Sequence, residues 1–128
     1  MQIDIDLSFQ NLTEIPALDK NTTNLNLACN QIVDISPLKE YTNLIYLSLM
    51  NNPISDLSVL KNLKNLRYLN LEYLDITDLN FLTELNELEF LDLRFARVKK
   101  SALSFSYSLP RYRERKLEIK HYLNGDHI

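Results

Sequence analysis

The chain has 128 residues, of which 45% are hydrophobic and 24% charged, and its formal net charge is −3. This length and composition predict one folded domain and argue against disorder. No apolar run approaches the roughly 20 residues of a membrane span. The first residues, MQIDID, show neither a basic stretch nor an apolar leader, and the single cysteine, Cys29, suits a reducing compartment. We therefore expect a cytoplasmic protein without membrane contacts.

Glycine occurs once, at Gly125. Phosphate-binding loops and dinucleotide fingerprints need several glycines, because the backbone must approach the phosphate closely. The composition therefore excludes most nucleotide-dependent enzymes.

Aliphatic residues recur at a spacing of 22 residues along most of the chain. The most regular columns are Leu25, Leu47, Leu69 and Leu91, followed two residues later by Leu27, Leu49, Leu71 and Leu93. Five further columns keep the same step and begin at Ile32, Ile35, Leu38, Tyr41 and Leu44. A fixed period of this length indicates a repeat protein in which stacked units share one core.

Each unit contains two kinds of local pattern. The Leu-x-Leu alternation predicts a short strand with one buried face, and the later Leu60, Leu63 and Leu66 spacing predicts a turn or two of helix on the opposite side. Two polar columns lie between them: expected helix N-caps at Ser36, Ser58 and Asn80, and expected turn residues at Asp34, Asp56 and Asp78.

These motifs resemble the leucine-rich-repeat family. The 22-residue units "LNLACNQIVDISPLKEYTNL", "LSLMNNPISDLSVLKNLKNL" and "LNLEYLDITDLNFLTELNEL" are similar to those of a phosphatase regulatory subunit and of the internalins. The 20-residue first unit, "IDLSFQNLTEIPALDKNTTN", resembles a bacterial-effector subclass. The resemblance implies an α/β fold, a short right-handed horseshoe of five to six parallel strands with turns or short helices on its convex side. It also implies a protein-binding role, although the fold serves many functions.

The chain departs from the family pattern at the turn that follows each strand. The asparagine expected there is present as Asn30 and Asn52 but is replaced by Gln10, Leu74 and Ala96 in the other units. We therefore expect the later turns to be less regular.

The C-terminal part also departs from the repeat. Residues 1–103 are predicted to form repeats, with units beginning near 5, 25, 47, 69 and 91, and residues 104–128 to form a basic cap. The segment 117–119 predicts a final strand in which Leu117 takes the place of Leu91. A helix from Ser108 to Tyr122 is the alternative.

The residues between and after the inward leucines are expected to line the concave sheet. Aromatic side chains concentrate there, which predicts a binding surface. The alternatives are cross-strand stacking that stabilises the fold, or rings that the C-terminal tail covers. The candidate partner-binding residues are Tyr46, Tyr68, Phe90, Tyr73, Phe95, Glu72, Asp92, Arg94, Asn70 and Met50.

Charge is unevenly distributed along the chain. Residues 1–93 contain 5 Lys and Arg against 14 Asp and Glu, whereas residues 94–128 contain 9 against 3. The acidic face predicts one basic protein partner, while the basic end is either a cap that complements the acidic body or a second binding site. The acidic main face argues against nucleic acid.

No arrangement of residues predicts catalysis, a metal site, a cofactor or a small-molecule substrate. Cys29 lies far along the repeats from His121 and His127, and the carboxylates lack an acid–base partner. We expect a non-enzymatic module that inhibits one protein, as an immunity protein inhibits a toxin. The alternatives are a regulatory or targeting subunit and a substrate-recognition fragment of a ubiquitin-ligase-type effector.

Overall fold

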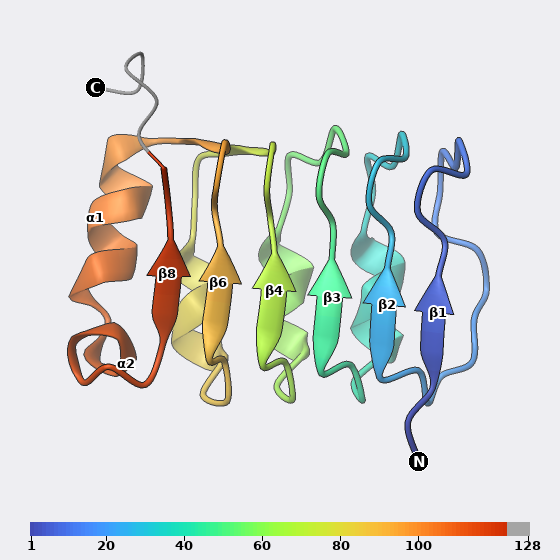
Figure 1. Cartoon of the computed structure of the whole chain (residues 1–128), viewed down its shortest axis with the longest axis horizontal. Coiled ribbons are helices and arrows are strands. Elements are labelled where there is room, and N and C mark those ends of the chain that lie inside the picture. The colour runs from blue at the N-terminus through green and yellow to red at the C-terminus, as the bar shows by residue number, and fades with distance from the viewer. Residues whose placement is uncertain (123–128) are drawn as a thin grey trace.

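The computed structural model describes residues 1–122. Six short parallel strands form one sheet in the order β1-β2-β3-β4-β6-β8. Their bounds are β1 Asp4–Asp6, β2 Asn24–Asn26, β3 Tyr46–Ser48, β4 Tyr68–Asn70, β6 Phe90–Asp92 and β8 Glu118–Lys120. Figure 1 shows the six strands side by side and pointing the same way. The predicted solenoid is therefore confirmed.

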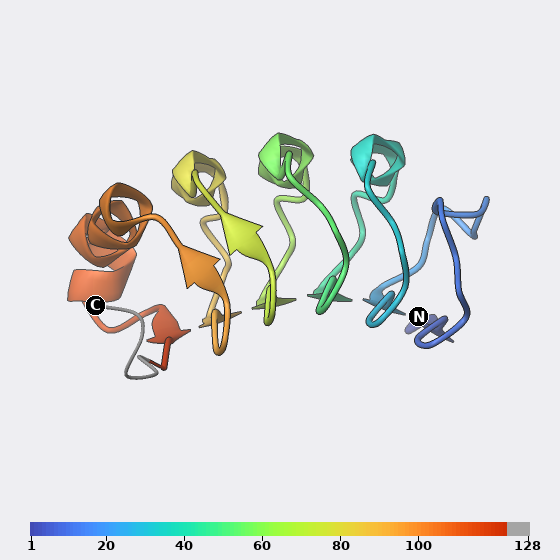
Figure 2. The ribbon, with the colours of Figure 1, turned by 90° about the horizontal axis from the view of Figure 1, so that it is seen from above.

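Short helices form the opposite side of the molecule. One 3₁₀ helix follows each of three consecutive strands: η1 (Ser36–Glu40), η2 (Ser58–Asn62) and η3 (Asn80–Glu84). Seen from above, the strands lie on the inner side of a gentle arc and the helices on the outer side (Figure 2). The chain thus has a concave face made of strands and a convex face made of helices.

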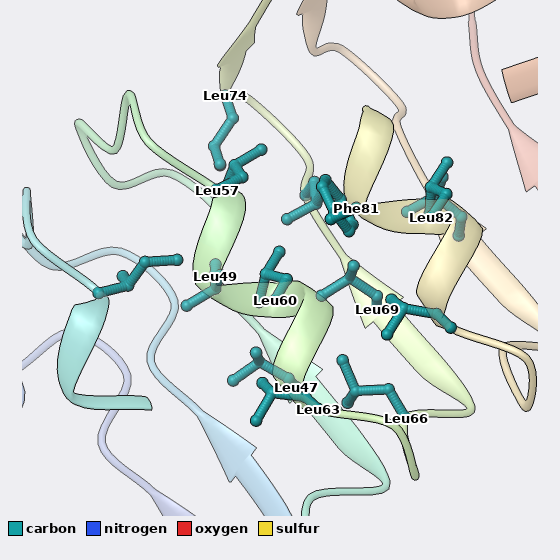
Figure 3. Close-up of a cluster of buried hydrophobic side chains, with 14 of the residues drawn as sticks. Leu47, Leu49, Leu57, Leu60, Leu63, Leu66, Leu69, Leu74, Phe81 and Leu82 are labelled. Carbon is teal, nitrogen blue, oxygen red and sulfur yellow. The ribbon is translucent and has the colours of Figure 1, made fainter. Parts of the chain in front are cut away.

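Leucine side chains fill the space between these two layers. In the third unit, Leu47 of β3 and Leu49 just after it point inward and meet Leu60 of η2 and Leu63, which directly follows η2 (Figure 3). All four are fully buried. Because each unit repeats this arrangement, the columns form one continuous core that no unit could bury alone.

The predicted helix caps at Ser36, Ser58 and Asn80 are wrong. The helices have no side-chain cap, and these residues are instead their first residues. The backbone N–H of each donates to the carboxylate two residues earlier, at 2.8 Å for Asp34, 2.9 Å for Asp56 and 2.6 Å for Asp78. The prediction that the aspartates satisfy backbone donors at the turn is confirmed.

Asn30 and Asn52 close the turns after β2 and β3, as predicted. Asn52 Nδ2 donates to the carbonyls of Leu27 (2.9 Å) and Leu49 (3.1 Å), and its Oδ1 accepts the Ile32 N–H at 3.1 Å. Asn30 makes the equivalent hydrogen bonds: its Nδ2 donates to the carbonyls of Leu7 and Leu27, and its Oδ1 accepts the Gln10 N–H. Each amide therefore joins two neighbouring units through buried backbone groups.

The later turns are regular, contrary to the prediction. Leu74 and Ala96 are buried, and β5 (Asp75–Ile76) pairs in parallel with β7 (Arg97–Val98) to form a second, two-stranded sheet. The Arg97 N–H donates to the Leu74 carbonyl at 2.8 Å, and the Lys99 N–H donates to the Ile76 carbonyl at the same distance. Hydrogen bonds between backbone groups, rather than a side-chain amide, therefore join these two turns.

The predicted final strand is confirmed, with a corrected register. Ile119, rather than Leu117, pairs with Leu91, so the last unit is longer than expected. Two helices, α1 (Lys100–Ser108) and α2 (Pro110–Arg113), occupy the added length. The expected domain boundary after residue 103 falls within α1, and the alternative helix through Tyr122 is not formed. Within residues 1–122, no helix has the length and apolar character needed to cross a bilayer.

Candidate protein-interaction face

Three outward positions per unit form the surface that we call the strand face. They are the two ends of each strand and the residue two positions after it: Asp4, Asp6 and Ser8; Asn24, Asn26 and Ala28; Tyr46, Ser48 and Met50; Tyr68, Asn70 and Glu72; Phe90, Asp92 and Arg94; Glu118, Lys120 and Tyr122. The parallel register Asn24↔Tyr46↔Tyr68↔Phe90 places equivalent residues side by side.

Aromatic rings form a row at the start of three neighbouring strands. Tyr68 is 43% exposed, whereas Tyr46 and Phe90 are half-buried. The Tyr68 and Phe90 ring centroids are 6.4 Å apart. Burial raises the pKa of Tyr46, and the charges of Glu72, Asp92 and Asp6 contribute in the same direction. This strand row thus combines a cross-strand ring contact with exposed apolar surface in an acidic setting.

A second aromatic row lies in the turns that follow the strands, and these turns form the upper edge of the ribbon in Figure 1. Tyr73 and Phe95 are 55% and 37% exposed, and their rings stack with centroids 5.2 Å apart. Both have a positive φ, as do Phe9, Cys29 and Asn51 at the equivalent positions. Bulky residues seldom adopt this left-handed backbone, which costs about 1 kcal/mol or more without glycine. The aromatic residues of this turn row are thus held in a backbone conformation that smaller side chains adopt more readily.

Arg94 is fixed between its neighbours on the strand face. Its guanidinium makes hydrogen bonds to the Asp92 carboxylate, the shortest at 2.6 Å, and lies 4.0 Å from Glu72. Asp92 itself is only 3% exposed. Asp92 was predicted to contact a partner, but its burial gives it a different role. It holds Arg94 in place from beneath.

Asn70, Glu72 and Met50 lie beside this cluster, each half-buried. Asn70 Nδ2 donates to Glu72 Oε1 at 2.9 Å, and Asn70 Oδ1 accepts the Glu72 backbone N–H at 2.9 Å. Together with Arg94 they form a polar floor between the two aromatic rows. The structure therefore brings all ten predicted site residues onto one side of the molecule, nine of them with accessible surface.

Tyr122 belongs to this surface and was missed by the sequence reasoning. Its ring meets Phe95 edge-on at 5.7 Å and lies 5.8 Å from the Arg94 guanidinium. In the observed register it occupies the column of Arg94, two residues beyond the last strand. Because Leu117 was aligned with Leu91, the sequence placed Tyr122 outside that column. Among the described residues, the C-terminal segment thus packs against the aromatic side chains through Tyr122.

The basic residues of the C-terminal part make mostly local contacts. Arg97 lies 3.8 Å from Asp75, and Arg111 donates to the Leu88 carbonyl at 2.8 Å. Lys116 and Lys120 pair with glutamates two residues away. The Arg111 contact joins the cap to the repeats, as expected for a segment that closes the solenoid, whereas the Arg97–Asp75 pair joins two repeats.

Within residues 1–122, no group of three or more His, Cys, Asp or Glu side chains has the arrangement of a metal site. Cys29 is a half-buried free thiol in the turn row, beside Asn51. The surface therefore offers apolar rings, amides and carboxylates as its contact groups.

Comparisons with known proteins agree with this architecture. The family profile for leucine-rich repeats (2 copies) matches residues 23–62 and again residues 42–84. No curated protein matches the sequence.

Similar solved structures come from bacteria. Internalin C2 of Listeria monocytogenes has a TM-score of 0.64 at 23% identity, over 80% of this chain and 53% of that one. The internalin inlF of the same organism has a TM-score of 0.68 at 23% identity, over 82% and 36%. A leucine-rich-repeat protein of Leptospira interrogans has a TM-score of 0.67 at 25% identity, over 77% and 25%. This chain therefore spans about half or less of each of these structures.

The fold and the repeat profile together define the class of protein. The chain is a leucine-rich-repeat protein, and its 22-residue units stack as those of the internalins do. Domains of this class are typically protein–protein interaction modules.

Proposed function

We propose that this protein binds one protein partner through its strand face and the adjoining turn row, and that binding inhibits the partner, as an immunity protein inhibits a toxin. The observation that carries the proposal is the exposure of Tyr68, Tyr73 and Phe95 from neighbouring units of one face. Exposed aromatic groups are unfavourable for solubility and supply much of the affinity at protein interfaces.

The size of the face supports a single partner. Six strands at about 4.8 Å spacing give a sheet roughly 24 Å across. Such a surface matches the roughly 800 Å² that each protein buries in an interface of standard size. The acidic groups on the face favour a partner with a basic surface, which they would attract at long range.

The proposal is tested with the partner recovered from a lysate and purified. We expect a one-to-one complex by light scattering, weakened at least tenfold by Tyr68→Ala. Val33→Ala, which removes exposed apolar surface elsewhere, serves as the control. Undiminished affinity of a Tyr46→Ala, Tyr68→Ala, Phe90→Ala triple variant would refute a concave binding site.

A regulatory or targeting subunit is the competing function. An enzyme assay of the partner separates the two, because an inhibitor abolishes turnover at saturation whereas a regulatory subunit changes substrate preference or location.

A further inference from the structure

Acidic and basic side chains are separated between the two faces of the repeats. Five Lys and Arg precede residue 94 in the sequence, and none of them lies on the strand face. Lys20 pairs with Glu40 at 2.9 Å and Lys64 with Glu84 at 3.0 Å, both involving the convex helices. The strand face from β1 to β4 therefore carries Asp4, Asp6 and Glu72 without any cation of its own.

The two carboxylates of β1 are exposed. Hydrogen bonds from the backbone N–H and the hydroxyl of Ser8 lower the pKa of Asp6. Asp4 accepts only amide hydrogen bonds, from Gln2 and from Asn24 at 2.6 Å. Both aspartates thus present negative charge that no basic side chain of the described residues neutralises.

The opposite end of the face has the reverse character. From β4 onward it carries the exposed rings of Tyr68, Tyr73 and Phe95, and the charge of Arg94 is balanced there by Asp92 and Glu72. Between these ends the face carries the amides of Asn24 and Asn26 on β2 and the half-buried Tyr46 and Met50 of the next unit. Apart from the exposed ring of Phe9 in the turn after β1, the binding surface therefore has an acidic N-terminal part and an aromatic C-terminal part.

We infer that the partner binds in one fixed orientation, with Lys or Arg side chains over Asp4 and Asp6 and an apolar anchor over Tyr68, Tyr73 and Phe95. This inference rests on the proposed function and specifies the chemistry and polarity of the recognised segment. From β1 to β4 there are three strand spacings, or about 14 Å. The two groups are thus separated by about four residues of extended chain or nine of helix.

The reversed orientation is disfavoured at the β1 end of the face. It would remove water from Asp4 and Asp6 with an apolar group in their place. Burying an ionised carboxylate without a partner is costly, because the lost hydration is not replaced. The face therefore selects the direction in which the partner segment lies across the strands, as well as the composition of that segment.

The test uses a displayed library of random 16-residue peptides, selected on the immobilised full chain. We expect the binders to carry two or more Lys or Arg at the stated distance from an aromatic or large aliphatic residue. Asp4→Asn with Asp6→Asn should weaken their affinity about tenfold and reduce its salt dependence. The matched control, Glu14→Gln with Asp19→Asn, makes the same charge change off the strand face and should leave affinity unchanged.

A second measurement isolates the contact itself. Replacing the peptide's basic residues with Gln should weaken binding to the native chain, but not to the Asp4→Asn, Asp6→Asn variant, because the pair is already broken. Binders that need Tyr68 and Phe95 but are indifferent to Asp4 and Asp6 would overturn the inference and leave the proposed function intact. If no binder depends on either group, both fail.

Discussion

The turns that follow the strands are closed differently in the two halves of the molecule. In the N-terminal half, the amides of Asn30 and Asn52 satisfy buried backbone groups of two neighbouring units. In the C-terminal half, Leu74 and Ala96 occupy the same positions, and the backbones pair with each other as β5 and β7. A repeat can therefore have an apolar side chain in place of a polar contact if its backbone groups find other partners.

The largest expected effect is on the asparagine-closed half. Asn52→Ala should lower the free energy of unfolding by about 3 kcal/mol, because the Leu27 and Leu49 carbonyls and the Ile32 N–H lose their partner in a buried place. Urea denaturation measures the loss. Asn62→Ala, an exposed asparagine on η2, is the control and should change stability by less than about 0.5 kcal/mol.

The reciprocal change tests the other half. Leu74→Asn should lower stability by about 2 kcal/mol, because the new amide is buried where the neighbouring backbone groups already have partners. The same denaturation experiment applies, with Leu74→Met as the apolar control. If Leu74→Asn is as stable as the native chain, then the missing asparagine, rather than packing, determines how the later turns close.

A smaller and opposite effect is expected in the turn row. Phe9 has φ 59°, is 73% exposed and has no ring partner among the described residues, so Phe9→Asn should stabilise the fold by about 0.5–1 kcal/mol. Tyr73→Asn relieves the same backbone but loses the stack on Phe95, and the two effects should nearly cancel. A thermal melt of each variant compares them. Loss of stability in Phe9→Asn would show that its ring packs more tightly than its exposure indicates.

The smallest expected effect is on the stability of the fold at acid pH. Hydrogen bonds from Ser36 and Ser58 lower the pKa values of Asp34 and Asp56 below the ordinary 3.8. A lowered folded-state pKa adds stability above the unfolded pKa, and this is lost as pH falls through the folded value. We therefore expect the urea concentration at the unfolding midpoint to decrease as the pH is lowered below about 4. In the double variant Asp34→Asn, Asp56→Asn, the amide still accepts the hydrogen bond but does not titrate, so this decrease should be shallower.

The sequence was sufficient for the parts of the fold that repeat. The 22-residue step assigned Leu47, Leu49 and Leu60 to the core and placed Tyr46 beside Tyr68, since every internal unit has the same length. It failed where one unit differs from the next. The final unit contains α1 and α2, and no column of the repeat fixes the position of β8 after such an insertion.

The candidate site was predicted to the same extent and for the same reason. Outward positions follow from strand alternation, which located nine accessible site residues. Burial of Asp92 beneath Arg94 depends on one ion pair between particular side chains, and a periodic pattern carries no information about it. Tyr122 was missed because its column depends on the register of β8.

The spacing of the paired strands also bears on how the chain folds. Partners in the main sheet are 20 residues apart at β1–β2, 22 in the internal pairs and 28 at β6–β8. Loop-closure entropy grows only with the logarithm of loop length, so the longest and shortest closures differ by about 0.3 kcal/mol. No single pairing is therefore an entropic bottleneck. Folding can begin at any adjacent pair of units and extend in both directions, with contacts that are never far apart in the sequence.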